Sequence, residues 1–170
     1  NKIFEISIPS MPGKNNTQGK LMAILNLPKF DPFGLVLILH GLGGSSKRYG
    51  LCRMSKSLLD AGFAVLRLNL RGADPGRNLA PGTYSAKCSS DLVPVFKFAK
   101  DFISSYTKNK PSIKKIPFYG VGISLGGTIL LNACLDEGNI NSPLLDGLVC
   151  TSSPLDLKEC SKSIERRRNF

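Results

Sequence analysis

Residues 120–127 read GVGISLGG and place Ser124 between Gly122 and Gly126 in a G-x-S-x-G pattern. In one recurring arrangement, such a serine occupies a sharp turn between a buried strand and a helix, and its hydroxyl acts as a nucleophile. The pattern alone is weak, because the chain has 17 glycines among 170 residues and chance matches occur. The elements on either side therefore decide how Ser124 is interpreted.

The flanks of Ser124 are typical of a strand and a helix. Residues 116–123 are predicted to form a strand, and the apolar residues 125–136 are predicted to form a helix. Gly122 and Gly126 are small where the strand and helix must pass close together. Ser124 would then stand at a helix N-terminus, where amide N–H groups and the helix dipole favour the negative charge of an oxyanion. We predict that Ser124 is a catalytic nucleophile.

A second glycine-rich turn follows another apolar segment. Residues 34–40 (GLVLILH) are typical of a strand buried on both faces, and HGLGGSS occupies residues 40–46. In a nucleophile elbow, one N–H of the oxyanion hole comes from such an earlier loop, and the other comes from the residue after the nucleophile. We therefore predict that the backbone N–H groups of Leu42 and Leu125 form the oxyanion hole. A plain tight turn at HGLGG is the alternative.

The rest of the chain alternates between the two types of element. Strands are predicted at residues 2–9, 19–28, 34–40, 63–70, 116–123 and 145–152, and helices at residues 46–60, 89–106 and 125–136. This alternation indicates an α/β protein with a mostly parallel sheet and helices on both faces. A short polar turn joins the first two strands, so we expect an antiparallel N-terminal hairpin. No domain boundary is visible, which indicates a single domain over residues 1–170.

Composition argues against several other classes of protein. No apolar run approaches the roughly 18 residues of a transmembrane segment, and no signal peptide is visible. Five cysteines without a CxxC pair fit reduced thiols in a cytoplasmic protein. His40 is the single histidine, and no ligand spacing suits zinc, so we expect neither a metal nor a cofactor.

The charge of the chain raises the question of a polyanionic partner. The net charge is +11, but most of the basic residues are scattered and are not interleaved with aromatic residues as in nucleic-acid-binding proteins. We therefore expect no nucleic-acid partner. A basic surface is compatible with peripheral contact with an anionic membrane.

Five segments together resemble the α/β-hydrolase superfamily and, within it, the YheT-like branch. They are HGLGGSS (40–46) with Tyr49 after it, GFAVLRLNLRG (62–72), TYSAKCSSDL (83–92), GISLGG (122–127) and DGLVCTSSPLDL (146–157). The resemblance implies an α/β-hydrolase fold, of which this chain supplies strands one to six. It also implies a Ser–acid–His triad and esterase or lipase-like action on a small-molecule or lipid ester.

The resemblance further implies that these residues hold only part of the triad. In this fold the acid and the histidine follow the serine, yet no histidine follows Ser124. We expect both groups, with the last strands of the sheet, beyond a C-terminally truncated domain that is inactive alone. His40 as base and Asp156 as acid are alternatives. Otherwise His40 is expected to position its loop, and Asp156 to cap a helix.

Three residues near the end of the strand predicted at residues 63–70 are candidates for the pocket. Asn69, Arg71 and Asp74 follow a strand at the same end of the sheet as Ser124. They either line the pocket or fix the loop through an Arg71–Asp74 pair.

A non-catalytic binding protein of the same fold and an acyltransferase are the alternative functions. Dinucleotide binding is disfavoured, because the glycine pattern at residues 120–126 follows the fifth strand and not the first.

Overall fold

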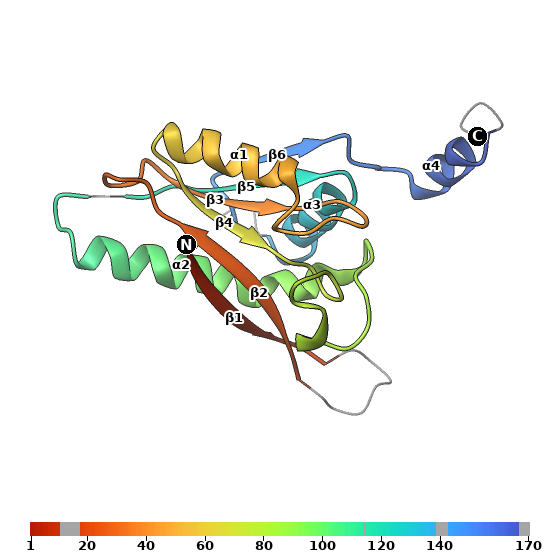
Figure 1. The fold of residues 1–170 in the computed structure, drawn as a ribbon, viewed down its shortest axis with the longest axis horizontal. Helices are drawn as coiled ribbons and strands as arrows, with labels where there is room; N and C mark the ends of the chain where they lie inside the picture. The colour runs from red at the N-terminus through yellow and green to blue at the C-terminus, as the bar shows by residue number, and fades with distance from the viewer. Residues whose placement is uncertain (11–17, 114, 139–142, 167–170) are drawn as a thin grey trace.

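A computed structural model describes residues 1–10, 18–113, 115–138 and 143–166 of the chain. Its centre is a six-stranded sheet with the order β1-β2-β4-β3-β5-β6 (Figure 1). The strands are β1 (Lys2–Ile8), β2 (Gly19–Asn26), β3 (Leu35–Leu39), β4 (Ala64–Leu68), β5 (Phe118–Ile123) and β6 (Gly147–Thr151). β2 runs antiparallel to both β1 and β4, whereas β4, β3, β5 and β6 are parallel to one another. The mostly parallel sheet with an N-terminal hairpin is confirmed.

Helices cover both faces of the sheet, as the alternation of elements predicted (Figure 1). α1 (Tyr49–Asp60) packs on one face, and α2 (Val93–Lys108) and α3 (Leu125–Glu137) pack on the other. The short 3₁₀ segments η1 (Arg77–Leu79) and η2 (Cys88–Leu92) lie in the connections. α4 (Leu157–Ile164) follows β6, extends away from the sheet and buries none of its residues.

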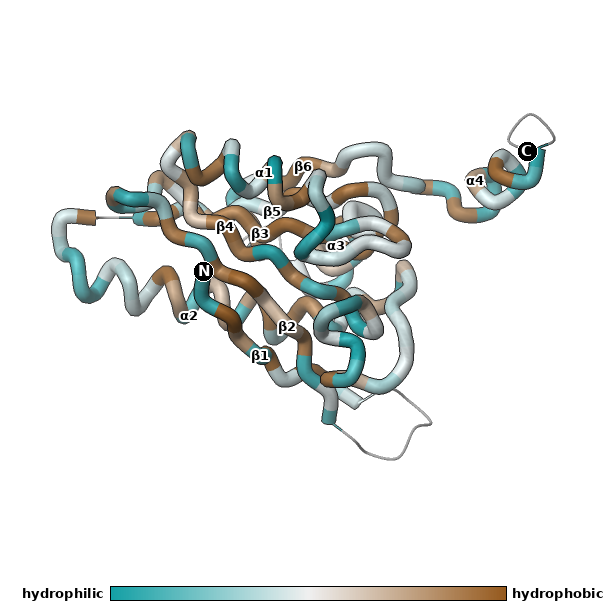
Figure 2. The backbone as a smooth tube through the Cα atoms, in the orientation of Figure 1, coloured by the Kyte–Doolittle hydropathy of each residue, from teal (hydrophilic) through white to brown (hydrophobic). Residues whose placement is uncertain are grey.

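The core lies in two layers because β3 and β4 alternate their side chains between the two faces of the sheet. Leu37 and Leu66 are paired in register, are fully buried and face α2 and α3. Val36 and Ile38 belong to a smaller cluster that faces α1. Figure 2 shows the resulting hydrophobic runs along the central strands. These strands are apolar at nearly every position since both faces are covered.

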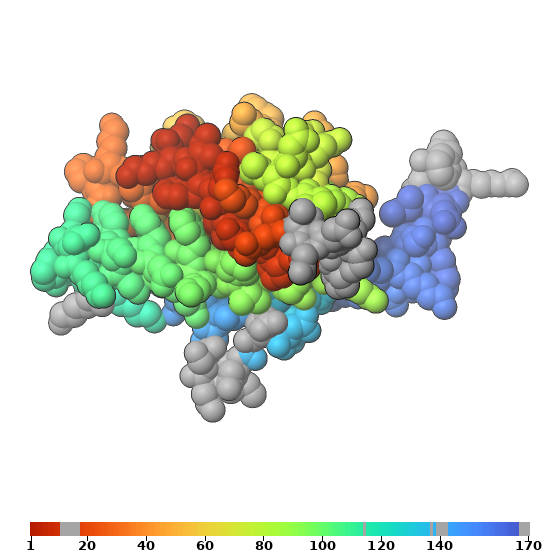
Figure 3. Space-filling model, turned by 90° about the horizontal axis from the view of Figure 1, so that it is seen from below, coloured from red at the N-terminus to blue at the C-terminus, as the bar shows by residue number. Residues whose placement is uncertain are grey.

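α2 closes the lower layer along the N-terminal hairpin. Figure 3 shows the two lying side by side, and the rings of Phe4 in β1 and Phe98 in α2 have centroids 5.0 Å apart. The sequence predicted one helix from residue 89. In the structure this segment begins with the 3₁₀ turn η2, and α-helical geometry starts at Val93. Pro94 lies in the first turn, where its missing N–H breaks no hydrogen bond.

The helix predicted from residue 46 also begins later, at Tyr49. Ser46 is fully buried in the loop before α1, and its N–H donates to the side chain of Asn69 at 2.9 Å. That long-range bond holds the backbone in a turn, so the helix starts only after it.

Packing between backbones is close where β5 crosses α3. A Cβ atom at Gly122 would lie 2.2 Å from the Cα of Gly127, which is a backbone atom that cannot rotate away. A Cβ atom at Gly50, in α1, would have no neighbour within 4 Å. Glycine is therefore required at residue 122 for a packing reason and is dispensable at residue 50.

We predict that Gly122→Ala lowers the free energy of unfolding by about 3 kcal/mol through overpacking. The matched variant Gly50→Ala should raise it by up to about 1 kcal/mol, because alanine is the better helix former. Urea denaturation of the two variants and the parent protein measures both effects. Equal stabilities for the two variants would contradict the crossing geometry.

Candidate active site

Ser124 lies between β5 and α3, as the sequence predicted. Its backbone has φ 51° and ψ −127°, a conformation that residues with a side chain rarely adopt. Three backbone hydrogen bonds hold it there. The Ser124 N–H donates to the Thr151 carbonyl at 2.8 Å, and the Ser124 carbonyl accepts from the N–H groups of Gly127 and Thr128 at 2.9 and 3.3 Å. Strain of this kind persists only where the surrounding structure enforces it, and it is concentrated at functional sites.

The two glycine-rich turns meet at Ser124. A Cβ atom at Gly41 would lie 2.9 Å from the Cβ of Ser124 and 3.6 Å from its Oγ. A Cβ atom at Gly126 would lie 2.3 Å from the carbonyl oxygen of His40. Only glycine permits this approach at either position. The structure thus brings the loop that carries Leu42 directly beside the predicted nucleophile.

His40 is fully buried, and both of its ring nitrogens have backbone partners. Nε2 accepts a hydrogen bond from the Leu70 N–H at 3.1 Å, so we assign the ring proton to Nδ1, which lies 2.9 Å from the Gly41 carbonyl oxygen. Burial lowers the pKa of His40, and the bond to the Gly41 carbonyl partly opposes this shift. His40 is therefore a neutral brace of the loop and has no free nitrogen to act as a general base.

The carbonyl oxygen of Gly41 is held by three donors. Besides His40 Nδ1–H, it accepts from the hydroxyl of Tyr84 at 2.9 Å and from the N–H of Gly44 at 3.0 Å. The N–H of Leu42 belongs to the same planar trans peptide and points in the direction opposite to this carbonyl. Fixing the carbonyl therefore fixes the direction of the Leu42 N–H.

Neither predicted oxyanion donor is used in a hydrogen bond within the part of the chain that the structure describes. No acceptor is found there for the N–H of Leu42 or of Leu125. Leu125 is the first residue of α3, and an N–H in the first turn of a helix has no intrahelical acceptor. The Leu42 side chain is 78% exposed, at the rim of the site.

The alternative prediction that Arg71 pairs with Asp74 is wrong. Arg71 is 2% exposed and contacts Asp91 at two points, Nε to Oδ2 at 2.9 Å and Nη2 to Oδ1 at 2.7 Å. This bonding raises the pKa of Arg71, against the opposing effect of burial. Asp74 instead pairs with Arg77 at 3.2 Å on the exposed surface. A buried guanidinium needs partners that satisfy it, and the buried Asp91 provides them together with the carbonyls of Pro81 and Pro9, at 3.2 and 2.9 Å.

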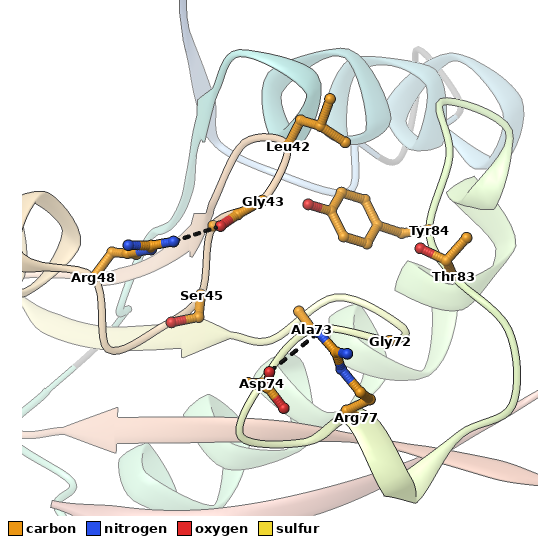
Figure 4. Close-up of a pocket in the computed structure, with 11 residues that line it drawn as sticks. Leu42, Gly43, Ser45, Arg48, Gly72, Ala73, Asp74, Arg77, Thr83 and Tyr84 are labelled. Atoms are coloured by element: carbon orange, nitrogen blue, oxygen red, sulfur yellow. Dashed lines mark hydrogen bonds and ion pairs between the residues drawn. The ribbon is translucent and has the colours of Figure 1, made fainter.

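The loop residues therefore divide between support and cavity lining. A cavity of about 430 Å³ lies between the loops that follow β3 and β4, and Asp74 lines it (Figure 4). Neither Arg71 nor Asn69, which is 1% exposed and holds the loop before α1, is part of its lining. Tyr84 lines the same cavity, and sequence reasoning missed it. Its only signal was its place in the TYSAKCSSDL segment, where nothing marks the residue as a contact of Gly41.

Asp156, the alternative acid, caps α4. Its side chain accepts from the N–H of Glu159 at 2.9 Å, which confirms the capping role.

In the described ranges, no three His, Cys, Asp or Glu side chains are grouped so that they could hold a metal ion. No helix in the same ranges is long and apolar enough to cross a membrane.

The sheet order, the hairpin and the strand–serine–helix turn define an α/β-hydrolase fold. The chain belongs to the family described as serine aminopeptidase S33, whose sequence profile matches residues 31–167. Two similar solved structures share the fold. A serine hydrolase homologue from Coxiella burnetii has a TM-score of 0.67 at 19% identity, covering 95% of this chain and 67% of that one. A serine hydrolase from Xanthomonas campestris has a TM-score of 0.63 at 16% identity, covering 92% and 64%.

Two curated relatives show similarity at the sequence level. An abhydrolase domain-containing protein of Dictyostelium discoideum is 33% identical over 76% of this chain. Human phospholipase ABHD3 is 28% identical over 79% of this chain. The chain spans 30% of the length of each of these relatives. Membership of the YheT-like branch stays a prediction.

The buried, neutral His40 predicts a pH dependence of stability. Its pKa is lowered in the folded chain from the ordinary 6.5, so the unfolded chain takes up a proton at a higher pH than the folded chain. The free energy of unfolding should therefore fall as the pH drops below about 6.5, by at most about 1.4 kcal/mol per pH unit.

Urea denaturation between about pH 7.5 and pH 5 measures this slope. Because the chain has one histidine, His40→Gln should flatten the slope in that window. The same slope in the parent protein and in His40→Gln would show that His40 is not the group responsible.

Proposed function

We propose that this chain carries the nucleophile and the oxyanion hole of a serine hydrolase that cleaves carboxylic esters, with lipid esters as its substrate class. The observation that carries the proposal is the position of Ser124. It is held at positive φ, directly beside a loop whose Gly41–Leu42 peptide is fixed by three donors. The names of two relatives support an ester substrate, since one is a phospholipase and a yeast relative is a medium-chain fatty acid ethyl ester synthase/esterase.

In the proposed reaction, Ser124 Oγ attacks the carbonyl carbon of the ester and gives its proton to a histidine. The carbonyl oxygen becomes an oxyanion that accepts hydrogen bonds from the N–H groups of Leu42 and Leu125. Collapse of this intermediate breaks the ester bond, and the histidine returns the proton to the leaving alcohol. Water then loses a proton to the same histidine and attacks the acyl group on Ser124. The bond from the acyl carbon to Ser124 Oγ breaks, the histidine returns the proton to Oγ, and the acid is released.

We propose that the histidine and its acid come from sequence outside residues 1–170. Both ring nitrogens of His40 are engaged, and Asp156 caps a helix, so neither is free for these roles. On this proposal, residues 1–170 form part of a single α/β-hydrolase domain. The solved homologue from Coxiella burnetii, of which this chain covers 67%, supports a domain with further elements. Activity assays therefore use the full-length protein.

A second candidate differs only in the acceptor of the acyl group. The name of the yeast relative, which is 32% identical over 65% of this chain, includes ester synthesis as well as hydrolysis. An alcohol in place of water would take the acyl group from Ser124 through the same steps.

We also propose peripheral contact with an anionic membrane, which the net charge of +11 favours.

Ser124→Ala tests the nucleophile. In the full-length protein, it should lower kcat for a short-chain p-nitrophenyl ester by about 10⁴-fold or more, because no other hydroxyl can form the acyl-enzyme. It should also abolish labelling by a fluorophosphonate probe. Ser105→Ala, at an exposed position on α2, is the matched control and should retain both signals. Labelling that survives Ser124→Ala would place the nucleophile at another serine.

Tyr84→Phe tests the positioning of the oxyanion loop. Losing one hydrogen bond to the Gly41 carbonyl removes about 0.5–1.5 kcal/mol of net stabilisation. We expect kcat to fall about 2- to 10-fold with KM little changed, because the Leu42 N–H acts mainly on the transition state.

The matched control is Tyr106→Phe on α2, outside the site, which removes the hydrogen bond from the Tyr106 hydroxyl to Asp31. Its kcat should equal that of the parent protein. A change in KM alone in Tyr84→Phe, or equal effects of the two variants, would overturn the positioning role of Tyr84.

A further inference from the structure

The cavity beside Leu42 is lined by polar groups. It lies between the loop after β3 and the loop after β4, and Ser45, Thr83 and Tyr84 contribute hydroxyl groups to its wall (Figure 4). The aliphatic side chains in the lining are Leu42 and Ala73 alone. An acyl chain binds by burying CH₂ groups against apolar surface, and this wall offers little of it. The cavity therefore suits the polar alcohol arm of an ester.

The charged groups of the lining are two arginines and one carboxylate. Arg48 and Arg77 stand on opposite sides of the cavity, and Asp74 lies beside Arg77. The lining thus carries a net positive charge. A cavity with a net positive charge raises the local concentration of anionic ligands.

Arg48 has no carboxylate partner among the described residues. One of its N–H groups donates to the Gly43 carbonyl at 3.1 Å, which ties the guanidinium to the oxyanion loop. A guanidinium has five N–H donors in a fixed fork, so the others are left for a ligand. Anchoring by the backbone also reduces the ordering that a ligand must impose on this side chain.

Arg77 is paired, but only weakly. Its contact with Asp74 is 3.2 Å long, and the two side chains are 65% and 69% exposed. Exposed ion pairs of this kind contribute little stability, so an anion can take N–H groups of Arg77 at small cost. Arginine forks suit phosphate and carboxylate groups because two parallel N–H donors match two oxygens.

We propose that this cavity binds an anionic group, a phosphate or a carboxylate, on the alcohol arm of the ester, with Arg48 and Arg77 as its donors. Leu42 connects the two sites, because its N–H is the proposed oxyanion donor and its side chain lines the cavity. The assignment to a substrate rests on the proposed ester hydrolysis. Binding of the anion does not, and it can be measured without any reaction.

The first experiment measures binding by calorimetry in full-length Ser124→Ala protein. The probes are glycerol 3-phosphate, glycerate and glycerol, which carry a phosphate, a carboxylate and no charge. We expect the anionic probes to bind and glycerol to bind at least 10-fold more weakly. The better anionic probe identifies the preferred group. Arg48→Gln and Arg77→Gln should each raise its Kd about 10-fold, as for the loss of a charge-assisted hydrogen bond.

Arg53→Gln is the matched control, because it removes the same charge from neighbouring α1. Arg53 stacks over the ring of Tyr49 and does not line the cavity. Its Kd should match that of the parent. Equal losses in Arg53→Gln, binding of glycerol as tight as that of the anions, or binding of no probe would overturn the proposal. Circular dichroism verifies folding, and if Arg48→Gln unfolds through loss of its bond to Gly43, Arg77→Gln alone decides.

The second experiment compares kcat/KM for the butyrate esters of glycerol 3-phosphate and glycerol. The ratio of the two should fall about 10-fold in Arg77→Gln and stay constant in Arg53→Gln. A constant ratio in Arg77→Gln would overturn the link between the cavity and the substrate. Hydrolysis of neither ester, with anion binding intact, would instead refute the proposed esterase activity and leave the anion site standing.

Discussion

The hydrogen bonds to the carbonyl oxygen of Gly41 join two parts of the chain that are far apart in sequence. His40, directly before Gly41, and Tyr84, from the loop after β4, both donate to this oxygen, and the Gly41 loop itself lies against Ser124 of the elbow. Because one peptide plane links the Gly41 carbonyl to the Leu42 N–H, the same bonds that stabilise the loop also aim a donor. Such fixed dipoles need no reorganisation during a reaction, which is how an oxyanion hole lowers a barrier.

Tyr84 depends in turn on a buried ion pair. Its N–H donates to the Arg71 carbonyl at 3.0 Å, and the Arg71 side chain is bonded to Asp91 beneath the loop. Removing one partner of such a pair leaves a buried charge uncompensated and is strongly destabilising. The pair therefore fixes the two ends of the loop between β4 and α2, and Tyr84 extends from it to the oxyanion loop.

Much of the fold could be predicted from local pattern. Apolar runs at residues 34–40 and 63–70 indicated buried parallel strands, and the spacing around Ser124 indicated the elbow, because both signals come from consecutive residues. The Arg71–Asp91 pair could not be predicted in this way. Asp74 is the closer carboxylate in sequence, and only the tertiary fold buries Asp91 beside the guanidinium. The role of Tyr84 was hidden for the same reason, since its partner is 43 residues away.

The most direct test of the account is the structure of the full-length protein after reaction with a phosphonate that mimics the tetrahedral intermediate. The account predicts a covalent bond from Ser124 Oγ to phosphorus. It also predicts one phosphonyl oxygen at about 2.7–3.1 Å from the backbone nitrogens of both Leu42 and Leu125. A phosphonyl oxygen that points to solvent, or a Leu42 N–H turned away from the adduct, would contradict the central claim.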